Sequence, residues 1–163
     1  MPTLPEIIPE GFCLKCQGCC RFAEEDSVWA PGLLGTEIED LLAGALVPSQ
    51  VTSQKKIRLV ACQGGNNFVC PFLNLKDNQC RIYPQRPFEC RLYPFLIHRK
   101  AGKAFLAVDL RCPFAKERHQ TQDFQGYIQA VTRILRTPEC KKILQENSQI
   151  LQEYPQVTDL TEL

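Results

Sequence analysis

The segment Cys13-Leu14-Lys15-Cys16-Gln17-Gly18-Cys19-Cys20 places four thiols within eight residues. Folding alone rarely requires such a concentration of thiols, whereas zinc and iron–sulfur centres are commonly held by sets of four cysteines. Four further cysteines with wider spacing complete two such sets. We therefore predict metal binding by eight ligands: Cys13, Cys16, Cys19, Cys20, Cys70, Cys80, Cys90 and Cys112.

The compartment decides whether these cysteines form disulfides or bind metal. The first ten residues have no basic start, no apolar stretch of signal-peptide length, and prolines at Pro2, Pro5 and Pro9. No apolar run approaches the ~20 residues needed to span a bilayer. We therefore expect a cytoplasmic protein without a membrane span, in which thiols stay reduced and a cysteine cluster binds metal or takes part in redox chemistry.

Size and charge limit the classes of partner. With 163 residues, 44% of them hydrophobic, the chain is long enough to bury one core of its own. The formal net charge of +1 and the lack of a basic run give no electrostatic basis for binding nucleic acid. Arg21, Arg81, Arg91 and Arg111 each adjoin a candidate ligand. They are either solvated surface charges or groups that neutralise thiolates around a metal.

Residue spacing in the first half of the chain predicts short elements between irregular segments. We expect the cysteine-rich segment to be a loop. The pattern Thr36-Glu37-Ile38-Glu39 predicts a capping box, followed by a helix with Ile38, Leu41, Leu42 and Ala45 on one face. Alternation predicts a strand over residues 56–62, and turn residues place Cys70 and Cys80 on the two arms of one ribbon.

The second half of the chain carries clearer signals. Prolines at both ends of the segment 86–94 predict one or two helical turns that carry Cys90. A hairpin with arms at 95–99 and 104–110 is expected around Ala101-Gly102-Lys103 and leads to Cys112. Two amphipathic helices are expected within 120–154. The predicted fold is thus a small α+β single domain over 1–163, with a metal-binding region at 12–113 and a C-terminal helical pair.

The two remaining cysteines have simpler interpretations. Cys140 precedes Ile143 and Leu144 by three and four residues, so on a helix it shares their buried face and is a core thiol. Cys62 lies on a predicted strand near a glycine-rich turn and is also interpreted as structural. We therefore leave both outside the metal site.

The order of several motifs resembles that of a known family. C-x₂-C-x₂-C-C-R at 13–21 is followed by Cys-Pro-Phe-Leu at 70–73, then by a segment from Cys80 to Phe95 that contains Arg-Pro-x₂-Cys-Arg-x-Tyr-Pro-Phe, and finally by Cys112-Pro113. This pattern is similar to that of the CxxCxxCC cysteine-cluster family, whose members are described as chelating zinc or iron. The resemblance covers residues 12–113 and implies metal binding, without a defined biochemical role.

The spacing bears on which metal is bound. Zinc usually takes ligands in pairs from two C-x₂-C knuckles, whereas C-x₂-C-x₂-C resembles the bacterial iron–sulfur run. In the bacterial run the third cysteine is followed by three residues and then by a cysteine and a proline. Here Cys20 follows Cys19 directly, with no residue between them. Adjacent cysteines usually point in different directions, so the pair serves two neighbouring centres, or one of the two is a redox thiol. On spacing we favour an iron–sulfur cluster, such as [4Fe–4S], over zinc.

The sequence favours a non-enzymatic function. Closed sets of four thiolates leave no position for substrate, and no general base or cofactor loop is visible. We therefore expect a structural, metal-handling or electron-transfer role, with metal ions as the partners. The C-terminal helices offer a surface for a protein partner, although no sequence motif identifies such a partner. The alternative is an enzyme: some family members resemble flagellin lysine N-methylase, and a three-thiolate centre or an unligated thiol would permit metal-dependent or thiol redox catalysis.

Overall fold

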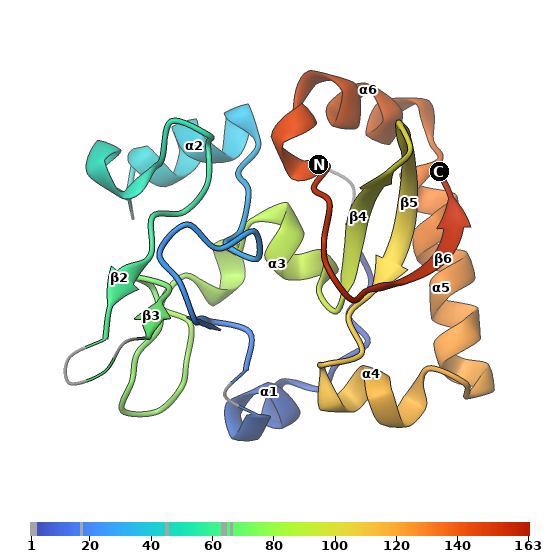
Figure 1. Ribbon diagram of the computed structural model, residues 1–163, viewed down its shortest axis with the longest axis horizontal. Coiled ribbons are helices and arrows are strands. Elements are labelled where there is room, and N and C mark those ends of the chain that lie inside the picture. Colours follow the sequence, from blue (N-terminus) through green and yellow to red (C-terminus); the bar gives the residue numbers. More distant parts are fainter. Residues whose placement is uncertain (1–2, 17, 45, 63–64, 66) are drawn as a thin grey trace.

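The structure of the protein, a computed structural model, describes residues 3–16, 18–44, 46–62, 65 and 67–163. They form a small mixed α+β domain with two antiparallel sheets, which confirms the predicted fold class. Figure 1 shows one sheet in each half of the molecule, with helix α3 (Phe88–Leu92) between the halves. Within the described residues, each helix is too short or too polar to cross a membrane.

The sheet of the C-terminal half is built on the predicted hairpin. Its strands, in the order β4-β5-β6, are β4 (Phe95–Lys100), β5 (Lys103–Val108) and β6 (Thr158–Glu162). Ala101 and Gly102 join β4 to β5 with positive φ angles of 49° and 76°. A two-residue turn of this kind matches the twist of the two strands, and glycine adopts it without steric cost. The hairpin prediction is confirmed.

Three helices accompany this sheet: α4 (Pro113–Arg118), α5 (Gln122–Leu135) and α6 (Pro138–Glu146). Thr121 and Thr137 cap α5 and α6, because their side chains accept the backbone N–H groups of Phe124 and Cys140. The two predicted amphipathic helices are confirmed. Strand β6 and helix α4 were not predicted, and β6 depends on pairing with β5 rather than on a local signal.

The sheet of the N-terminal half is much smaller. Its strands, in the order β1-β3-β2, are β1 (Arg21–Phe22), β2 (Val60–Ala61) and β3 (Phe68–Val69). Only Val60 and Ala61 of the predicted strand 56–62 join the sheet, while Lys56 and Ile57 form isolated bridges with Gly32 and Val51. The predicted strand was therefore too long, because its first residues pair with loop segments instead.

The prediction of a loop throughout the cysteine-rich segment was wrong. Residues Glu10–Cys16 form helix α1, so Cys13 and Cys16 are helical. The C-x₂-C spacing is compatible with a helix, because residues three apart lie on the same helical face. The described part of the chain also contains short 3₁₀ helices at Pro48–Gln50, Tyr83–Gln85 and Ser148–Ile150.

The predicted capping box is shifted by two residues. Helix α2 (Gly35–Leu42) has Leu34 rather than Thr36 as its N-cap. Glu37 accepts the backbone N–H of Leu34 at 2.9 Å, so the glutamate half of a capping box is present without its hydroxyl half. Ala45, which was expected on the apolar face of this helix, lies outside the described residues.

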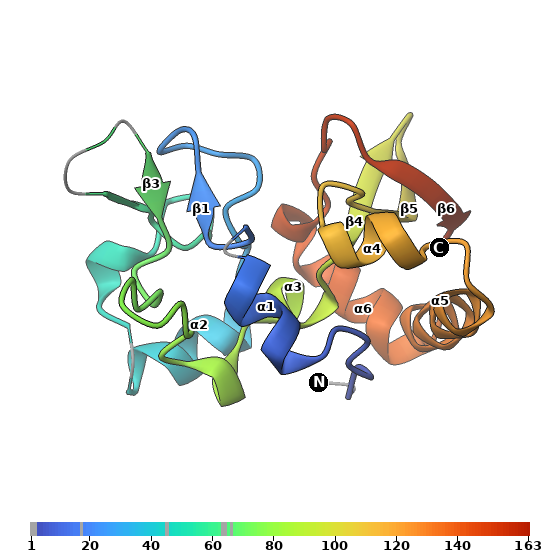
Figure 2. The same ribbon diagram turned by 90° about the horizontal axis from the view of Figure 1, so that it is seen from below.

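Two hydrophobic cores lie beneath these elements. The larger core joins β4, β5, α3 and the C-terminal helices, and contains Phe95, Leu106, Phe124 and Val131. The smaller core lies in the N-terminal half and contains Leu33, Leu41, Ile57 and Phe72, among others. Figure 2, viewed from below, shows helix α1 crossing in front of the boundary between the two halves.

Candidate metal centre

The eight candidate cysteines come from separate elements that meet between the two cores. Cys13 and Cys16 lie on α1, and Cys19 and Cys20 lie just before β1. Cys70 follows β3, and Cys80 pairs with Leu73 across a short ribbon. Cys90 lies in α3 and Cys112 is the N-cap of α4. Segments far apart in the sequence thus deliver thiols to one region.

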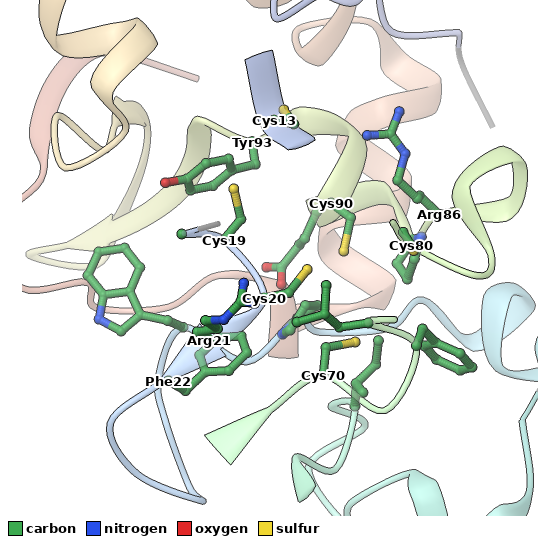
Figure 3. Close-up of a pocket in the computed structure, with 18 of the residues that line it drawn as sticks. Cys13, Cys19, Cys20, Arg21, Phe22, Cys70, Cys80, Arg86, Cys90 and Tyr93 are labelled. Carbon is green, nitrogen blue, oxygen red and sulfur yellow. The ribbon is translucent and has the colours of Figure 1, made fainter. Parts of the chain in front are cut away.

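A cavity of about 560 Å³ occupies this region. Its lining includes Cys13, Cys19, Cys20, Cys70, Cys80 and Cys90. Figure 3 shows Cys13 and Cys19 beside the ring of Tyr93, and Cys20, Cys70, Cys80 and Cys90 around the neighbouring space. Six of the eight predicted ligands therefore face one cavity.

Charge interactions group four of the thiols into what we call the first thiol set, consisting of Cys13, Cys16, Cys19 and Cys112. Burial raises the pKa of Cys13, and the nearby thiols of Cys112 and Cys16 raise it further. Burial also raises the pKa of Cys19 far above its usual value, with contributions from Cys20, Cys13, Cys112 and Cys16. Charge interactions of this kind weaken with distance, so these four sulfur atoms share one neighbourhood, to which Cys20 also belongs.

The other four thiols form the second thiol set, consisting of Cys20, Cys70, Cys80 and Cys90. A hydrogen bond between the Cys20 and Cys70 side chains is the main reason that the pKa of Cys20 is raised. Burial raises the pKa of Cys90, and the nearby thiols of Cys20 and Cys80 raise it further. Cys20 also interacts with Cys13, but its direct thiol partner is Cys70.

The backbone explains how each set comes together. Strands β1 and β3 pair Arg21 with Val69, which brings Cys20 opposite Cys70, and the Cys70 N–H donates to the Cys20 carbonyl at 3.0 Å. In the first set, the N–H groups of Ala115 and Phe114 at the start of α4 donate to the Cys112 sulfur and lower its pKa, although burial raises it overall.

The thiols of the described residues are not arranged in ligating geometry. Among the residues that the structure describes, no group of three or more Cys, His, Asp or Glu side chains is arranged so that it could hold a metal ion. Thiolates nevertheless match the ligand preferences of zinc and of iron–sulfur clusters. The donor chemistry therefore fits a metal, and the thiols would have to move from their present positions for one metal to contact four of them.

Arg86 is the positive charge that reaches the most thiols. Its guanidinium lowers the pKa of Cys13, Cys20 and Cys90, against the larger effect of their burial. Its Nε donates to the Tyr83 carbonyl at 3.1 Å, and its Nη2 pairs with Glu6 at 2.5 Å. Arg86 is thus held in place as a counter-charge for thiolates, although it is not adjacent to a cysteine in the sequence.

The four arginines that adjoin the candidate ligands have different roles. Arg21 lowers the pKa of Cys20 and donates to Asn78 at 2.7 Å. Arg91 lies 3.8 Å from Glu37, and Arg111 forms two hydrogen bonds with Asp109. Arg81 is exposed. Arg21 is thus the one of the four whose charge acts on a neighbouring thiol in the described residues, whereas Arg91 and Arg111 pair with carboxylates.

Two buried carboxylates lie in the wall of the cavity. Asp109 is 2% exposed and accepts the Tyr93 hydroxyl at 3.3 Å in addition to its pair with Arg111. Glu89 accepts the Gly32 N–H at 2.5 Å and the Tyr154 hydroxyl at 3.3 Å. Burial raises the pKa of Glu89 to about 7. Both carboxylates have hydrogen-bond partners and support the wall rather than pointing into it unpaired.

Two aromatic residues that line the cavity are not marked by any motif in the sequence. Trp29 and Tyr154 contact each other at 5.0 Å between ring centroids, and both line the cavity. They come from opposite ends of the chain, so only the folded structure brings them together.

Cys140 is 2% exposed in α6, as expected for a core thiol, and Cys62 packs against the smaller core. Neither of these cysteines lines the cavity.

Comparison with known proteins agrees with the cysteine pattern. A curated relative, "Uncharacterized protein MJ0661" of Methanocaldococcus jannaschii, is 25% identical over 107 residues, which is 60% of this chain. The aligned region spans about half (52%) of that relative's length. No solved structure matches the chain. The model of the CxxCxxCC family, described as "Putative zinc- or iron-chelating domain", matches residues 12–158 and therefore includes the C-terminal helices. This chain belongs to the CxxCxxCC family.

Proposed function

We propose that the protein binds metal at two four-thiolate centres. Cys13, Cys16, Cys19 and Cys112 form the first centre, and Cys20, Cys70, Cys80 and Cys90 form the second. The observation that carries this proposal is that six of the eight thiols line one cavity, in which the thiol of Cys20 is hydrogen-bonded to that of Cys70. Four thiolates complete the coordination of a structural zinc ion or of a [4Fe–4S] cluster.

For the first centre we propose an iron–sulfur cluster. The bacterial iron–sulfur run combines C-x₂-C-x₂-C with a further cysteine that precedes proline. This chain lacks a Cys-Pro directly after its cysteine run. We infer that the distant Cys112-Pro113 takes that place, because Cys112 is near enough to raise the pKa of Cys13 and Cys19. A cluster bound this way would supply one-electron redox chemistry.

The second centre takes each ligand from a different segment. Cys70 is buried, Cys20 and Cys80 pack against the smaller core, and Cys90 lies on α3 at the boundary of the two cores. Metal at this position would therefore connect the two halves of the molecule. We assign it a structural role, and its donor set accepts either zinc or iron.

The charges around the site support metal binding. Each four-thiolate centre on Zn²⁺, or on an oxidised [4Fe–4S] cluster, carries a charge of about −2. Arg86 and Arg21 lie near these thiols and offset part of that charge. Complete thiolate coordination leaves no position for a substrate. The function proposed for the protein is therefore metal handling or electron transfer rather than catalysis at the metal.

The test begins with protein purified without oxygen. Iron and acid-labile sulfide are measured together with zinc, and the visible spectrum is recorded. The proposal predicts stoichiometric metal, with iron, sulfide and broad visible absorption at the first centre. Colourless protein with about two zinc ions per chain would reject the iron–sulfur assignment and leave the two-centre proposal intact. Protein with no stoichiometric zinc or iron would reject both.

A further inference from the structure

The wall of the thiol cavity includes one segment without regular structure, which we call the strap and which consists of residues 3–8. Three of its side chains line the cavity together with the thiols: Glu6, Ile7 and Ile8. Among the described residues, no backbone–backbone hydrogen bond joins the strap to another segment. Figure 2 shows the strap in dark blue before α1, on the face of the molecule that carries α1. The strap is therefore held in place by contacts that involve side chains.

One side of the strap is attached to the C-terminal half of the molecule. Leu4 is 7% exposed and belongs to the larger core. The Tyr127 hydroxyl, on α5, donates a hydrogen bond to the Pro5 carbonyl. The Tyr127 ring stacks on Phe95 with 5.3 Å between the centroids, so this donor is itself held in position.

On the side of the thiols, an ion pair holds the strap. Glu6 lies 2.5 Å from Arg86, and the side chain of Glu6 is 55% exposed whereas that of Arg86 is 17% exposed. Glu6 thus lies on the solvent side of Arg86. The Arg86 guanidinium also lies over the ring of Tyr83, 3.7 Å from its centroid. Because of this second contact, the ion pair can open while Arg86 stays in the cavity wall.

Two cysteines lie behind this ion pair. Figure 3 shows Arg86 on the same side of the cavity as Cys80 and Cys90, with its guanidinium turned away from the Cys90 sulfur. The positive charge of Arg86 lowers the pKa of both thiols, against the larger effect of their burial, as expected for near neighbours. A solute that approaches Cys80 or Cys90 from the side of Glu6 therefore has to displace the strap.

We propose that the strap gates the approach of small thiophilic solutes, above all metal ions, to Cys80 and Cys90, and that the Glu6–Arg86 ion pair is its latch. Opening separates Glu6 from Arg86 and the Pro5 carbonyl from its donor, while the rest of the cavity wall keeps its contacts. The inference concerns access to the cavity, so it depends neither on the number of metal centres nor on the element bound.

The physical reason is the difference in cost between the parts of the wall. Local openings require less free energy where buried contacts and backbone hydrogen bonds are few. An ion pair with one partner largely in solvent is a weak contact. Opening the wall at β1 and β3 would break paired backbone, and moving α3 would expose Phe88 and Leu92 of the larger core. Of these parts, the strap opens at the lowest cost.

The test measures how fast a neutral thiol reagent reaches each cysteine. Full-length protein purified without oxygen is treated with N-ethylmaleimide, and the modified peptides are quantified over time by mass spectrometry. Whether a thiol is free or bound to metal, the reagent has to reach its sulfur. Cys140, which is 2% exposed in α6 and does not line the cavity, reports general unfolding in the same sample.

Two variants loosen the strap in different ways. Tyr127→Phe removes the hydrogen bond to the strap without changing any charge, and it should speed the modification of Cys80 and Cys90 about fivefold. Glu6→Gln opens the latch and should speed it about threefold, because the ion pair is partly exposed. Glu139→Gln, an exposed change at the start of α6, is the control and should leave the rates unaltered.

Faster modification of both cavity thiols in both strap variants, with Cys140 unchanged, would support the gate. Unchanged rates in both variants would overturn it, because solutes would then enter elsewhere. An increase in Glu6→Gln alone would mean that the lost charge acts on the thiols directly, and an increase in Tyr127→Phe alone would reject the latch. An equal increase at Cys140 would show that the strap stabilises the whole fold instead. The two-centre proposal would survive each of these results, because metal content decides it.

Discussion

At the scale of single residues, the two-centre proposal depends on the vicinal pair Cys19–Cys20. The Cys20 thiol is hydrogen-bonded to Cys70, whereas the Cys19 thiol has Cys20 itself, Cys13, Cys112 and Cys16 as its neighbours. The sequence left two roles open for the pair, as ligands of two neighbouring centres or as a ligand beside a redox thiol, and the two-centre proposal adopts the first.

The first prediction contrasts a ligand with a core thiol. Cys16→Ala should remove metal from the first centre, whereas Cys140→Ala should keep the full metal content. The Cys140 change leaves only a small cavity in α6, with a cost of about 1 kcal/mol. Elemental analysis together with denaturant unfolding measures both effects. Equal metal loss in the two variants would contradict the ligand set.

The second prediction concerns metal-free protein under oxidation. Cys20 and Cys70 face each other across β1 and β3, and their thiols are already in contact. Treatment with diamide should therefore join them first: each thiol gives up one proton and one electron, and diamide is reduced by two electrons. Peptide mapping by mass spectrometry identifies the bond. A dominant disulfide that omits this pair would show that the β1–β3 contact does not control the reactivity of these thiols.

At the scale of secondary structure, elements with strong local signals were predictable. Gly102, Thr137 and Pro138 mark the hairpin turn and the start of α6, and the structure forms these elements where the sequence placed them. Prolines around Cys90 predicted the short helix α3 in the same way. In each case the residues that start or end the element lie inside it or next to it.

Elements that depend on distant partners were not predictable. Strand β6 exists because Thr158–Glu162 pairs with β5, about fifty residues earlier. The cysteine-rich sequence of helix α1 is typical of a loop, whereas the packing of Phe12 on the distant Phe114 supports a helix. The sequence likewise indicated eight ligands but left their division open, because charge interactions between distant thiols arise only after folding.

The third prediction tests a contact between two such elements. Glu37, in α2, accepts the backbone N–H of Leu34 at 2.9 Å and that of Phe88, at the start of α3, at 2.6 Å. Glu37→Ala leaves two donors without their partner and should lower the free energy of unfolding by about 2 kcal/mol. Glu39→Ala, an exposed change in the same helix, should alter it by less than about 0.5 kcal/mol. Similar losses in both variants, measured by urea titration, would mean that the contact with α3 is unimportant.

At the scale of the whole molecule, the thiols lie where the two cores meet. Cys112 belongs to the larger core, and Cys70 to the smaller one. Helix α3 contributes Phe88 and Leu92 to the larger core and carries Cys90 toward the thiols of the smaller core. Metal bound to the second set would therefore add a direct connection between the halves shown in Figure 1.

The fourth prediction follows from this arrangement. Removal of metal should loosen the smaller core more than the larger one, because the smaller core has only two-residue strands and lies beside most of the second set. Structural zinc in small domains contributes roughly 10 kcal/mol or more, enough to decide whether short segments fold. Amide hydrogen exchange should show large losses of protection near Val69 and Phe72 and small ones in α5. Uniform protection before and after chelation would contradict a structural role for the metal.

The most direct test of the two-centre proposal is X-ray absorption spectroscopy of the protein purified without oxygen, combined with the metal count per chain. The account predicts a first coordination shell made only of sulfur, with four sulfur atoms around each metal, and complete loss of one centre's metal in Cys19→Ser or Cys80→Ser. Nitrogen or oxygen ligands in the shell, or metal at a single centre that survives both substitutions, would contradict it.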